Sequence, residues 1–204
     1  MMLSLCKKII IALVVCISSA AYAESAVNSK HPNLVLTKNG VKSIKAASGK
    51  AASFDAALAK LSADVNQSID TKIDVPVPKD AGGGYTHEQH KRNYKAIKGA
   101  GFLYQLTGEE KYLTHAKNLF LEYAKLYPSL GEHPKKKEQA PGRLFWQSLN
   151  ETVFLVYAIQ GYDAIIDSLT AQERAVIEEQ FIRPMAKFLS EESPATFNKI
   201  HNHG

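Results

Sequence analysis

Amide and imidazole side chains alternate in one short run of the sequence. The run reads Asn198-Lys199-Ile200-His201-Asn202-His203-Gly204. An amide donates hydrogen bonds, and an imidazole both donates them and exchanges a proton near neutral pH. These properties suit a site that stabilises a carboxylate while a hydrogen is moved. We therefore predict that the run forms a functional loop, behind a helix that Ser193-Pro194 terminates.

A second candidate group combines a basic loop with an aromatic side chain. Arg143, Trp146 and Gln147 follow Lys135-Lys136-Lys137 in the sequence. An indole ring can stack on a sugar and a guanidinium can bind a carboxylate through two hydrogen bonds, so the group suits a sugar acid. Trp146 could equally be a core anchor. The side chains predicted to bind substrate are Gln147, Arg143, Asn198 and His201, with Lys136 as a weaker candidate.

Two pairs of histidines raise the question of a metal site. His87 and His90 are three residues apart at a helix start, and His201 and His203 alternate. Neither pair matches the helical zinc motif, in which two histidines four residues apart enclose a glutamate. Surface or capping roles are the preferred interpretation. We expect no metal or other cofactor in this portion.

Other catalytic classes have weaker support. The sequence contains no G-x-S-x-G motif, and both of its cysteines, Cys6 and Cys16, lie near the N-terminus, in a leader. A serine or cysteine nucleophile is therefore disfavoured. Three carboxylates near the predicted loops, Glu88, Glu138 and Glu151, could serve glycoside hydrolysis. We prefer a structural interpretation, in which Glu88 supports a helix start and Glu151 forms a surface ion pair.

Residues 1–23 have the pattern of a secretory signal peptide. A charged start precedes an apolar run, and Ala21-Tyr22-Ala23 forms a cleavage motif before Glu24. The apolar run is too short to span a bilayer. A lipid anchor at Cys16 is disfavoured by the bulky residue before it. We expect a periplasmic or secreted protein that begins at Glu24 and contains no disulfide.

The charge of the chain is moderately basic. The formal net charge is +5, and a hydrophobic content of 45% is ordinary for a globular domain. Basic side chains concentrate at Lys91-Arg92 and at Lys135-Lys136-Lys137. This balance is consistent with a polyanionic substrate, although a solvated surface without a partner explains the charge alone better.

Helical patterns dominate most of the chain. Residues 24–52 mix short apolar pieces with turn residues and are expected to form an irregular arm. Pro184 is expected to kink or break the last helix. The predicted helices cover residues 53–68, 86–106, 107–126, 145–166 and 170–189. The predicted caps are Ser53 and, through capping boxes, Thr86, Thr107 and Thr170.

Short and long connections alternate between these helices. Helices joined by two or three residues must run antiparallel, so each such pair returns the chain to the end where it started. The long loops, at residues 82–90, 135–147 and 198–204, are therefore expected at one end. The hairpins start too far apart for a solenoid of short repeats. We predict an all-α fold of antiparallel hairpins in a closed or arced ring.

Four stretches of the sequence carry a family resemblance. They are HPNLVLTKNGV at 31–41, GGGYTHEQHKRNY at 82–94, GRLFWQSLNE at 142–151 and NKIHNHG at 198–204. In this order they resemble the alginate lyases of polysaccharide lyase family 17, exo-acting oligoalginate lyases related to the heparinase II/III-like enzymes. The resemblance covers essentially the whole chain after the leader.

The resemblance implies an N-terminal (α/α) toroid followed by a β-sandwich domain, with the active site between them. Residues 53–204 would then be an incomplete toroid and the N-terminal portion of a longer enzyme. That portion is expected to be inactive alone, because the proton-donating tyrosine of the family lies in a later segment. Asn202 and His203 match the Asn-His pair that holds the uronate carboxylate in the family. Zinc, where related lyases bind it, lies in the later domain.

The resemblance also implies alginate oligosaccharides as the binding partner and β-elimination, with release of an unsaturated uronate, as the reaction. Removing the weakly acidic C5 proton of a uronate places negative charge on its carboxylate, which donors on Asn202 and His203 can meet. The rival class is a non-catalytic helical carbohydrate-binding or scaffold protein. No nucleic acid is expected as a partner, and no membrane after leader cleavage. The sequence carries no signal for an oligomeric state.

Overall fold

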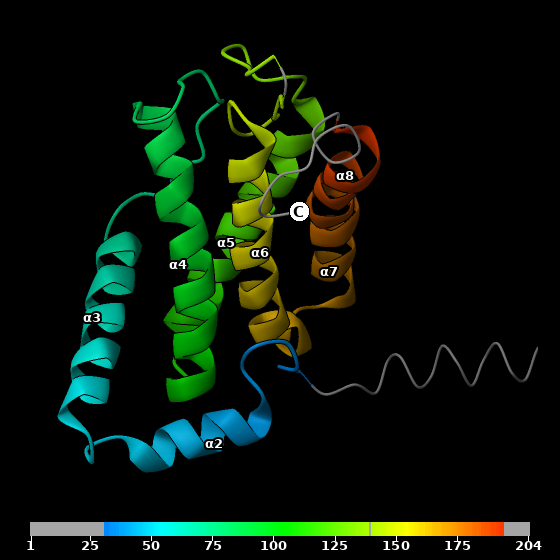
Figure 1. Cartoon of the computed structure of the whole chain (residues 1–204). Helices are drawn as coiled ribbons and strands as arrows, with labels where there is room; N and C mark the ends of the chain where they lie inside the picture. The colour runs from blue at the N-terminus through cyan, green and yellow to red at the C-terminus, as the bar shows by residue number, and fades with distance from the viewer. Residues whose placement is uncertain (1–30, 139, 194–204) are drawn as a thin grey trace, which may run out of the picture. The chain divides into compact units, whose positions relative to one another are not determined.

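The computed structural model describes residues 31–138 and 140–193, and this part of the chain is all helical, with no strand (Figure 1). The helices are α2 (Lys38–Ala47), α3 (Ala52–Ile69), α4 (Tyr85–Thr107), α5 (Glu110–Leu126), α6 (Ser148–Ile165), α7 (Ala171–Ile177) and α8 (Arg183–Lys187). The predicted all-α class is confirmed, whereas the toroid stays a prediction. None of the described helices is both long and apolar enough to cross a membrane.

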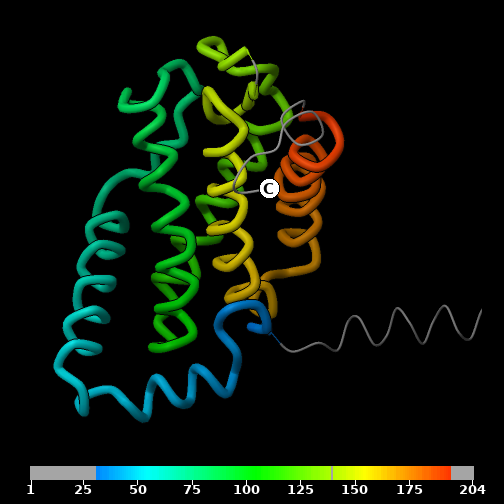
Figure 2. Tube along the Cα trace, in the orientation of Figure 1, coloured from blue at the N-terminus to red at the C-terminus, as the bar shows by residue number. Residues whose placement is uncertain are grey.

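Helix α4 lies at the centre of these helices and contacts α3, α5 and α6 (Figure 2). Its buried face carries Ile97, Ala100 and Leu103, which have no exposed surface. Three-residue spacing keeps these side chains on one side of the helix. Apolar surface removed from water in this way stabilises the fold by about 25 cal/mol per Å².

An aromatic cluster joins α5, α6 and the helical segment after α7. Phe181 stacks on Tyr123, with ring centroids 5.3 Å apart. It also meets Phe154 edge-on at 5.7 Å, and Tyr123 and Phe154 are 4.8 Å apart. Such pairs are attractive beyond the area that they bury, because ring edges and faces carry opposite partial charges. The cluster therefore fixes how the three segments pack.

Two glycines let α4 and α6 approach closely. A Cβ atom added to Gly101 would lie 2.8 Å from the carbonyl oxygen of Gly161, and one added to Gly161 would lie 2.7 Å from the carbonyl oxygen of Ile97. Both contacts are with backbone atoms, which cannot move aside as a flexible side chain can. The crossing of α4 and α6 thus depends on the absence of side chains at both positions.

We expect Gly161→Ala to lower the free energy of unfolding by about 1 to 3 kcal/mol, because the added methyl group overpacks the α4–α6 contact. Helix propensity alone would favour alanine by up to about 1 kcal/mol. Gly40→Ala in α2 is the matched control, because its added Cβ meets only the side-chain oxygen of Thr37, at 3.2 Å. Urea denaturation of both variants measures the difference. A Gly161→Ala protein as stable as Gly40→Ala would show that the crossing can relax.

The long connections into α4 and α6 lie at one end of the helices, as predicted (Figure 1). The segment Phe188–Glu192 finishes at this end too, while tight connections close the other end. We call the first end the loop end. The third predicted loop, at residues 198–204, lies outside the described residues.

The prediction of an irregular arm over residues 24–52 is wrong for residues 38–47, which form α2. Thr37 caps this helix by accepting a hydrogen bond from the backbone N–H of Gly40 at 3.0 Å. Only one residue of α2, Val41, is buried. The helical period therefore leaves little hydrophobic signal in the sequence.

The segment before α2 is attached to the C-terminal half of α6 by Asp163. One carboxylate oxygen accepts hydrogen bonds from the backbone N–H groups of Asn33 at 2.8 Å and Leu34 at 2.9 Å. The other lies 2.5 Å from Nδ1 of His31. Because Asp163 is buried, these bonds form away from water and hold the HPNL stretch in place.

The predicted caps are only partly correct. Thr170 forms its capping box, with the backbone N–H of Glu173 donating to the hydroxyl at 3.1 Å and the backbone N–H of Thr170 donating to the Glu173 carboxylate at 2.8 Å. Thr107 instead lies inside α4, which ends at the left-handed Gly108, with φ 76°. Ser53 lies one residue inside α3. Glycine favours the left-handed conformation so strongly that it sets the end of α4.

The predicted interruption at Pro184 is confirmed. The hydrogen bonding changes to a π-helical turn over Glu178–Ile182, immediately before α8, in which Pro184 occupies the first turn. Proline has no N–H to donate, so regular α-helical bonding cannot continue through it. A second π-helical turn, Phe188–Glu192, follows α8.

Candidate functional site

A buried carboxylate anchors the connection into α6. Glu151 has 0% exposed surface. One of its oxygens accepts a hydrogen bond from the Tyr127 hydroxyl at 2.9 Å, and the other accepts from the backbone N–H of Arg143 at 2.7 Å. Burial raises the pKa of Glu151 above its ordinary value. The expectation that Glu151 forms a surface ion pair is therefore wrong, because its partners come from inside the fold.

Gly142 is required where this loop crosses Glu151. A Cβ atom there would lie 2.2 Å from the carbonyl oxygen of Phe145 and 2.7 Å from the Glu151 carboxylate. Both distances are far below van der Waals contact, so no other residue fits without moving the loop. The glycine in GRLFWQSLNE thus has a packing reason.

The loop itself doubles back, so that its two halves pair through the backbone. The N–H of His133 donates to the carbonyl of Gly142 at 2.8 Å, and the N–H of Lys137 donates to the carbonyl of Trp146 at 2.8 Å. The N–H of Ser148 donates to the carbonyl of Ala140 at 3.0 Å. These bonds bring the lysine run next to Trp146 and the start of α6.

Arg143 joins this loop to the last described helical turn. Its guanidinium donates to the Glu192 carboxylate at 2.7 Å and lies 4.7 Å from the ring centroid of Phe188. The side chain remains 28% exposed. Arg143 therefore lies at the loop end, as predicted, but its charge already has a carboxylate partner.

Gln147 and Lys136, the other predicted substrate-binding residues that the structure describes, also have partners. The Gln147 amide donates to the Asn150 side chain at 2.8 Å, within one turn of the start of α6, and is half-buried. The Lys136 ammonium is exposed and lies 2.5 Å from the Glu132 carboxylate, which raises the pKa of Lys136. Gln147 is the better placed of the two to face a ligand in a cleft, because it is not fully solvated.

Trp146 is neither a buried core anchor nor a free platform. The side chain is half-buried, and its indole nitrogen would lie 3.5 Å from a Cβ atom added to Gly82. The Lys137 ammonium lies 6.0 Å from the ring centroid, within the range of a cation–π contact. Trp146 thus connects the glycine-rich loop before α4 to the basic loop before α6.

The start of α4 is held by a carboxylate from the preceding loop. Asp80 accepts hydrogen bonds from the backbone N–H of Thr86 at 2.9 Å and from its hydroxyl at 3.0 Å. The backbone hydrogen bond from Thr86 lowers the pKa of Asp80. The predicted capping box at Thr86 is wrong, because α4 begins at Tyr85 and Thr86 pairs with Asp80 instead. Glu88 does lie in the first turn, as expected, and pairs with Lys91 at 3.0 Å.

Three histidines are buried near this end, where surface or capping roles were expected for His87 and His90. His87, His90 and His133 are all buried, and burial lowers the pKa of each, to about 3 for His90. Nδ1 of His90 lies 2.8 Å from the Tyr123 hydroxyl. Within residues 31–138 and 140–193, Nδ1 of His87 and Nε2 of His90 have no hydrogen-bond partner. In the described part of the chain, no group of three or more His, Cys, Asp or Glu residues is placed to hold a metal ion.

These histidines predict that the fold loses stability in acid. The unfolded chain binds protons near pH 6.5, whereas the folded chain takes them up only at lower pH. The stabilisation is therefore complete above about pH 6.5 and decreases as pH falls towards 3, by up to about 1.4 kcal/mol per pH unit for each histidine.

Urea denaturation between pH 8 and pH 4 measures this dependence. His90→Gln should flatten the curve below pH 6.5, because one of the depressed pKa values is removed. The free energy of unfolding of the variant at pH 8, compared with that of the wild type, measures any loss of packing. If the free energy of unfolding of His90→Gln fell with pH as steeply as that of the wild type, the pKa of His90 would not be lowered by folding.

The candidate site is thus the described part of the loop end. Arg143 and Gln147 lie on the connection that Glu151 anchors, and Lys136 lies on its solvent side. The remaining predicted site residues, Asn198, His201, Asn202 and His203, lie outside the described residues. Sequence reasoning missed the anchoring roles of Glu151 and Asp80. The available signal for Glu151 was a carboxylate directly before the apolar run of α6.

Comparison with known proteins relates the chain to two curated sequences. It is 63% identical over 193 residues to an exo-oligoalginate lyase of Saccharophagus degradans, a match that covers 93% of this chain and 26% of that protein. It is 54% identical over 145 residues to an alginate lyase of Stenotrophomonas maltophilia, covering 71% of this chain and 19% of that protein. The chain therefore spans about a quarter or less of the length of these relatives. No family model matches the sequence.

Proposed function

This chain is a close homologue of the N-terminal part of an exo-oligoalginate lyase, and from that relationship we propose that it forms the helical part of an enzyme that cleaves alginate oligosaccharides by β-elimination. The observation that carries the proposal is the identity of 63% over 193 residues. Because the match covers 93% of the chain, it includes loop-end segments as well as the helical core. Substrate and reaction are proposals for the complete enzyme.

The proposed reaction removes the C5 proton of a uronate and expels the sugar bonded through O4. The electrons of the C5–H bond form the C4=C5 double bond, and the departing oxygen takes up a proton. Negative charge develops on the carboxylate while C5 loses its proton, so the site needs hydrogen-bond donors directed at that group. We assign this role to Asn202 and His203. Exo action would release an unsaturated uronate from the chain end.

The described loop end would supply part of the substrate cleft. We propose that Gln147 and Arg143 line it, with Asn198 and His201 from the following segment and Lys136 at its edge. The Gln147 amide is held by Asn150, which fixes the direction of its remaining donor and acceptor. Such pre-orientation strengthens binding, because less side-chain freedom is lost when a ligand arrives.

We expect Gln147→Ala to raise KM by roughly tenfold and to change kcat less, which corresponds to the loss of one hydrogen bond to the substrate. The variant is made in the complete enzyme and assayed with alginate oligosaccharides. Thr152→Ala, one turn further along α6 and exposed, is the matched control. If KM and kcat both stayed at wild-type values, Gln147 would have only a structural role at the helix start.

Incubation of the complete enzyme with alginate tests the reaction type. Elimination produces ultraviolet absorbance from the conjugated C4=C5 double bond, in products that shorten from one end. Products without that absorbance would show hydrolysis instead. Reversible binding with unchanged chain length would support the second candidate, a non-catalytic helical carbohydrate-binding protein.

We also propose that the protein is exported to the periplasm or secreted after cleavage before Glu24, and that this portion needs no cofactor. N-terminal sequencing of the exported protein tests the cleavage site. Dialysis against a chelator should leave the thermal transition of the described helices unchanged.

A further inference from the structure

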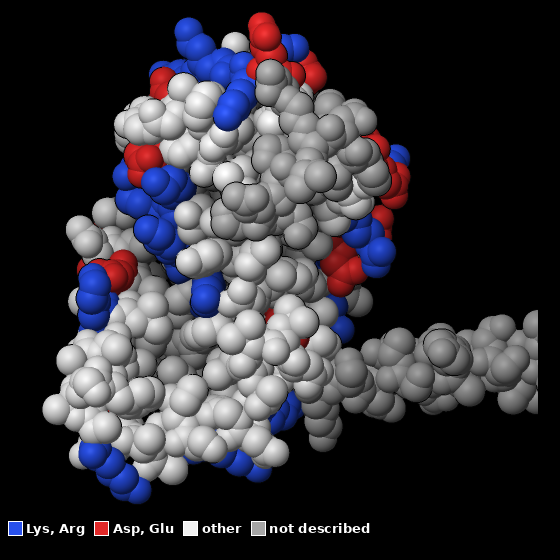
Figure 3. Space-filling model, in the orientation of Figure 1, with Lys and Arg blue, Asp and Glu red and all other residues white. Residues whose placement is uncertain are grey.

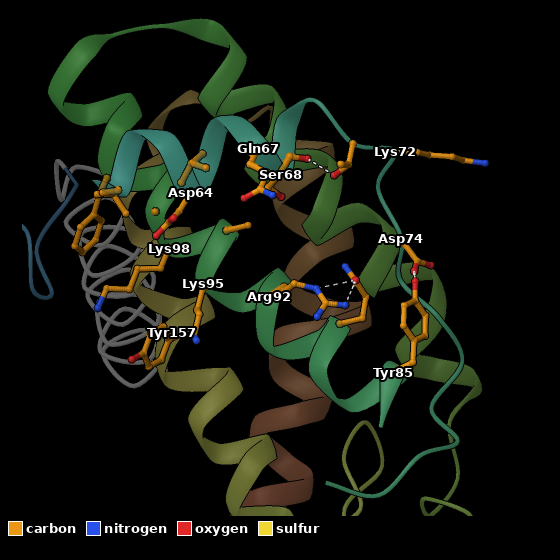
Figure 4. A pocket seen from close by; sticks show the side chains of 17 residues that line it. Asp64, Gln67, Ser68, Lys72, Asp74, Tyr85, Arg92, Lys95, Lys98 and Tyr157 are labelled. Atoms are coloured by element: carbon orange, nitrogen blue, oxygen red, sulfur yellow. Dashed lines mark hydrogen bonds between the residues drawn. The ribbon is translucent and has the colours of Figure 1, made fainter. Parts of the chain in front are cut away.

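A groove of about 840 Å³ runs between α3 and α4 (Figure 4), and neither Arg143 nor Gln147 is among the residues that line it. Its base lies where the two helices touch, since a Cβ atom added to Gly99 would be 2.7 Å from a methyl carbon of Val65. Beyond that contact α3 and α4 leave a space that is lined by both helices and by Tyr157 of α6. This volume is within the range of pockets that bind small ligands.

Four basic side chains line the groove: Lys72, Arg92, Lys95 and Lys98. Figure 3 shows Lys and Arg side chains gathered over α4 on the face that it draws. Among the described residues, Lys72 and Lys95 form no ion pair or hydrogen bond through their ammonium groups, and the Arg92 guanidinium donates only to the neutral side chain of Gln89, at 2.6 Å. These positive charges are therefore available to an anion.

The two carboxylates in the lining do not cancel this charge. Asp64 pairs with Lys60, outside the lining, at 3.0 Å. Asp74 accepts a short hydrogen bond from the neutral hydroxyl of Tyr85 and so keeps its charge (Figure 4). Four basic groups therefore outnumber two carboxylates in the lining, and one of these carboxylates is paired with a lysine outside it.

Aromatic rings lie next to the cations in this groove. The Lys98 ammonium lies 4.7 Å from the ring centroid of Tyr157 and 5.4 Å from that of Phe102. Both rings are half-buried. Contacts of this kind hold the ammonium close to an aromatic face. A ligand that has both an apolar ring face and an anionic group would be recognised by this pair of features.

We propose that this groove is a second binding site for an anionic oligosaccharide, namely a segment of an oligouronate. Arg92, Lys95 and Lys98 follow one another at three-residue intervals, a rise of about 4.5 Å each, close to the length that one sugar adds to a 1,4-linked chain. Carboxylates along such a chain can therefore meet successive cations. The neutral groups of Gln67 and Ser68 in the lining suit sugar hydroxyls.

The groove alone indicates that the ligand is an anion with apolar ring faces. The choice of a uronate chain as that ligand rests on the proposed function. Tyr85 lines the groove and is also the first residue of α4. The groove thus reaches towards the loop end, and a chain held there would have one end near that site. The groove would retain the substrate chain without taking part in the elimination.

Titration calorimetry with an alginate pentasaccharide tests the site in the complete enzyme carrying Asn202→Ala and His203→Leu, so that the ligand is not consumed. We expect two binding sites per molecule. Adding Lys95→Ala and Lys98→Ala should weaken one of them by about tenfold or more. Lys42→Ala with Lys45→Ala is the matched control, because these two exposed lysines on α2 have the same spacing and charge. Lys95→Glu alone, at an exposed position, repeats the test should the double variant fold poorly.

The outcomes separate this proposal from the proposed function. If only one binding site were found, and neither the double variant Lys95→Ala with Lys98→Ala nor Lys95→Glu changed its affinity, the groove would not be a binding site. The proposed elimination reaction would be unaffected by that result. If the protein bound the uronate chain in the groove but catalysed no elimination, the groove site would be supported and the proposed lyase activity would be refuted. Equal affinity for a neutral pentasaccharide of glucose, or binding of a hexaglutamate peptide in place of the uronate chain, would also overturn the groove site. Binding of the uronate should weaken from 50 to 300 mM salt, because exposed charges are screened.

Discussion

Replacing Asn202 with alanine, or His203 with leucine, is expected to lower kcat of the complete enzyme by about 10²- to 10³-fold, the usual effect of removing one donor from a developing oxyanion. Steady-state rates of double-bond absorbance measure this change. The two donors would act on the same carboxylate, so the double variant should lose less than the product of the two single effects.

A catalytic role and a packing role for these two residues differ in their effect on stability. We expect the melting temperatures of both variants to stay within a few degrees of wild type, in a range that corresponds to less than about 1 kcal/mol. Ser190→Ala, at an exposed position in the last described turn, is the control. A fully active His203→Leu enzyme would refute the assignment, and a large loss of stability would point to a packing role.

Glu151→Ala is expected to have the largest effect on stability, lowering the free energy of unfolding by about 3 kcal/mol or more. The substitution leaves the Tyr127 hydroxyl and the backbone N–H of Arg143 without an acceptor in a buried place, and it opens a cavity beside them. The connection into α6 would lose its anchor, so Arg143 and Gln147 would no longer be fixed. We therefore expect weaker substrate binding as well.

Two further variants isolate the cause. Glu151→Gln keeps the volume and one acceptor oxygen, so it should lose less stability than Glu151→Ala. Glu138→Ala removes an exposed carboxylate from the same loop and should stay within about 0.5 kcal/mol of wild type. Urea denaturation measures all three. Equal, small effects of the alanine and glutamine substitutions would contradict the anchoring role.

Periodicity in the sequence was enough to locate the long helices. The predicted helices at residues 53–68 and 86–106 correspond to α3 and α4. Apolar residues recur with the helical period in both: α4 buries most of its stripe, while in α3 Val65 is buried and Phe54, Leu58 and Leu61 are half-buried. Helix α2 was missed because it is only ten residues long and Val41 and Ile44 are its only large apolar side chains, too few to establish a helical period. The predicted cap at Thr86 failed for another reason: its partner, Asp80, lies in a preceding loop whose path no local motif describes.

The gathering of the long loops at one end was predicted from the sequence, but the hydrogen bonds within that end were not. Alternating short and long connections require the loops to gather at one end, and this needs no knowledge of packing. The burial of Glu151 and His90 depends on Tyr127 and Tyr123, which lie 24 and 33 positions away in the chain. Such contacts follow from tertiary packing and leave no periodic signal in the sequence.

The contact between Arg143 and Glu192 has a consequence for selectivity. The charge of this arginine is largely neutralised before any ligand arrives, since a carboxylate already lies 2.7 Å away. An arriving uronate would be the second anion at one guanidinium, and repulsion from Glu192 would offset much of its attraction. Arg143 itself therefore adds little to a general attraction of polyanions. Selection among anionic ligands at Arg143 then depends on whether the ligand's carboxylate fits the guanidinium N–H groups that Glu192 does not use. The position of the carboxylate on the sugar would therefore matter more than its charge.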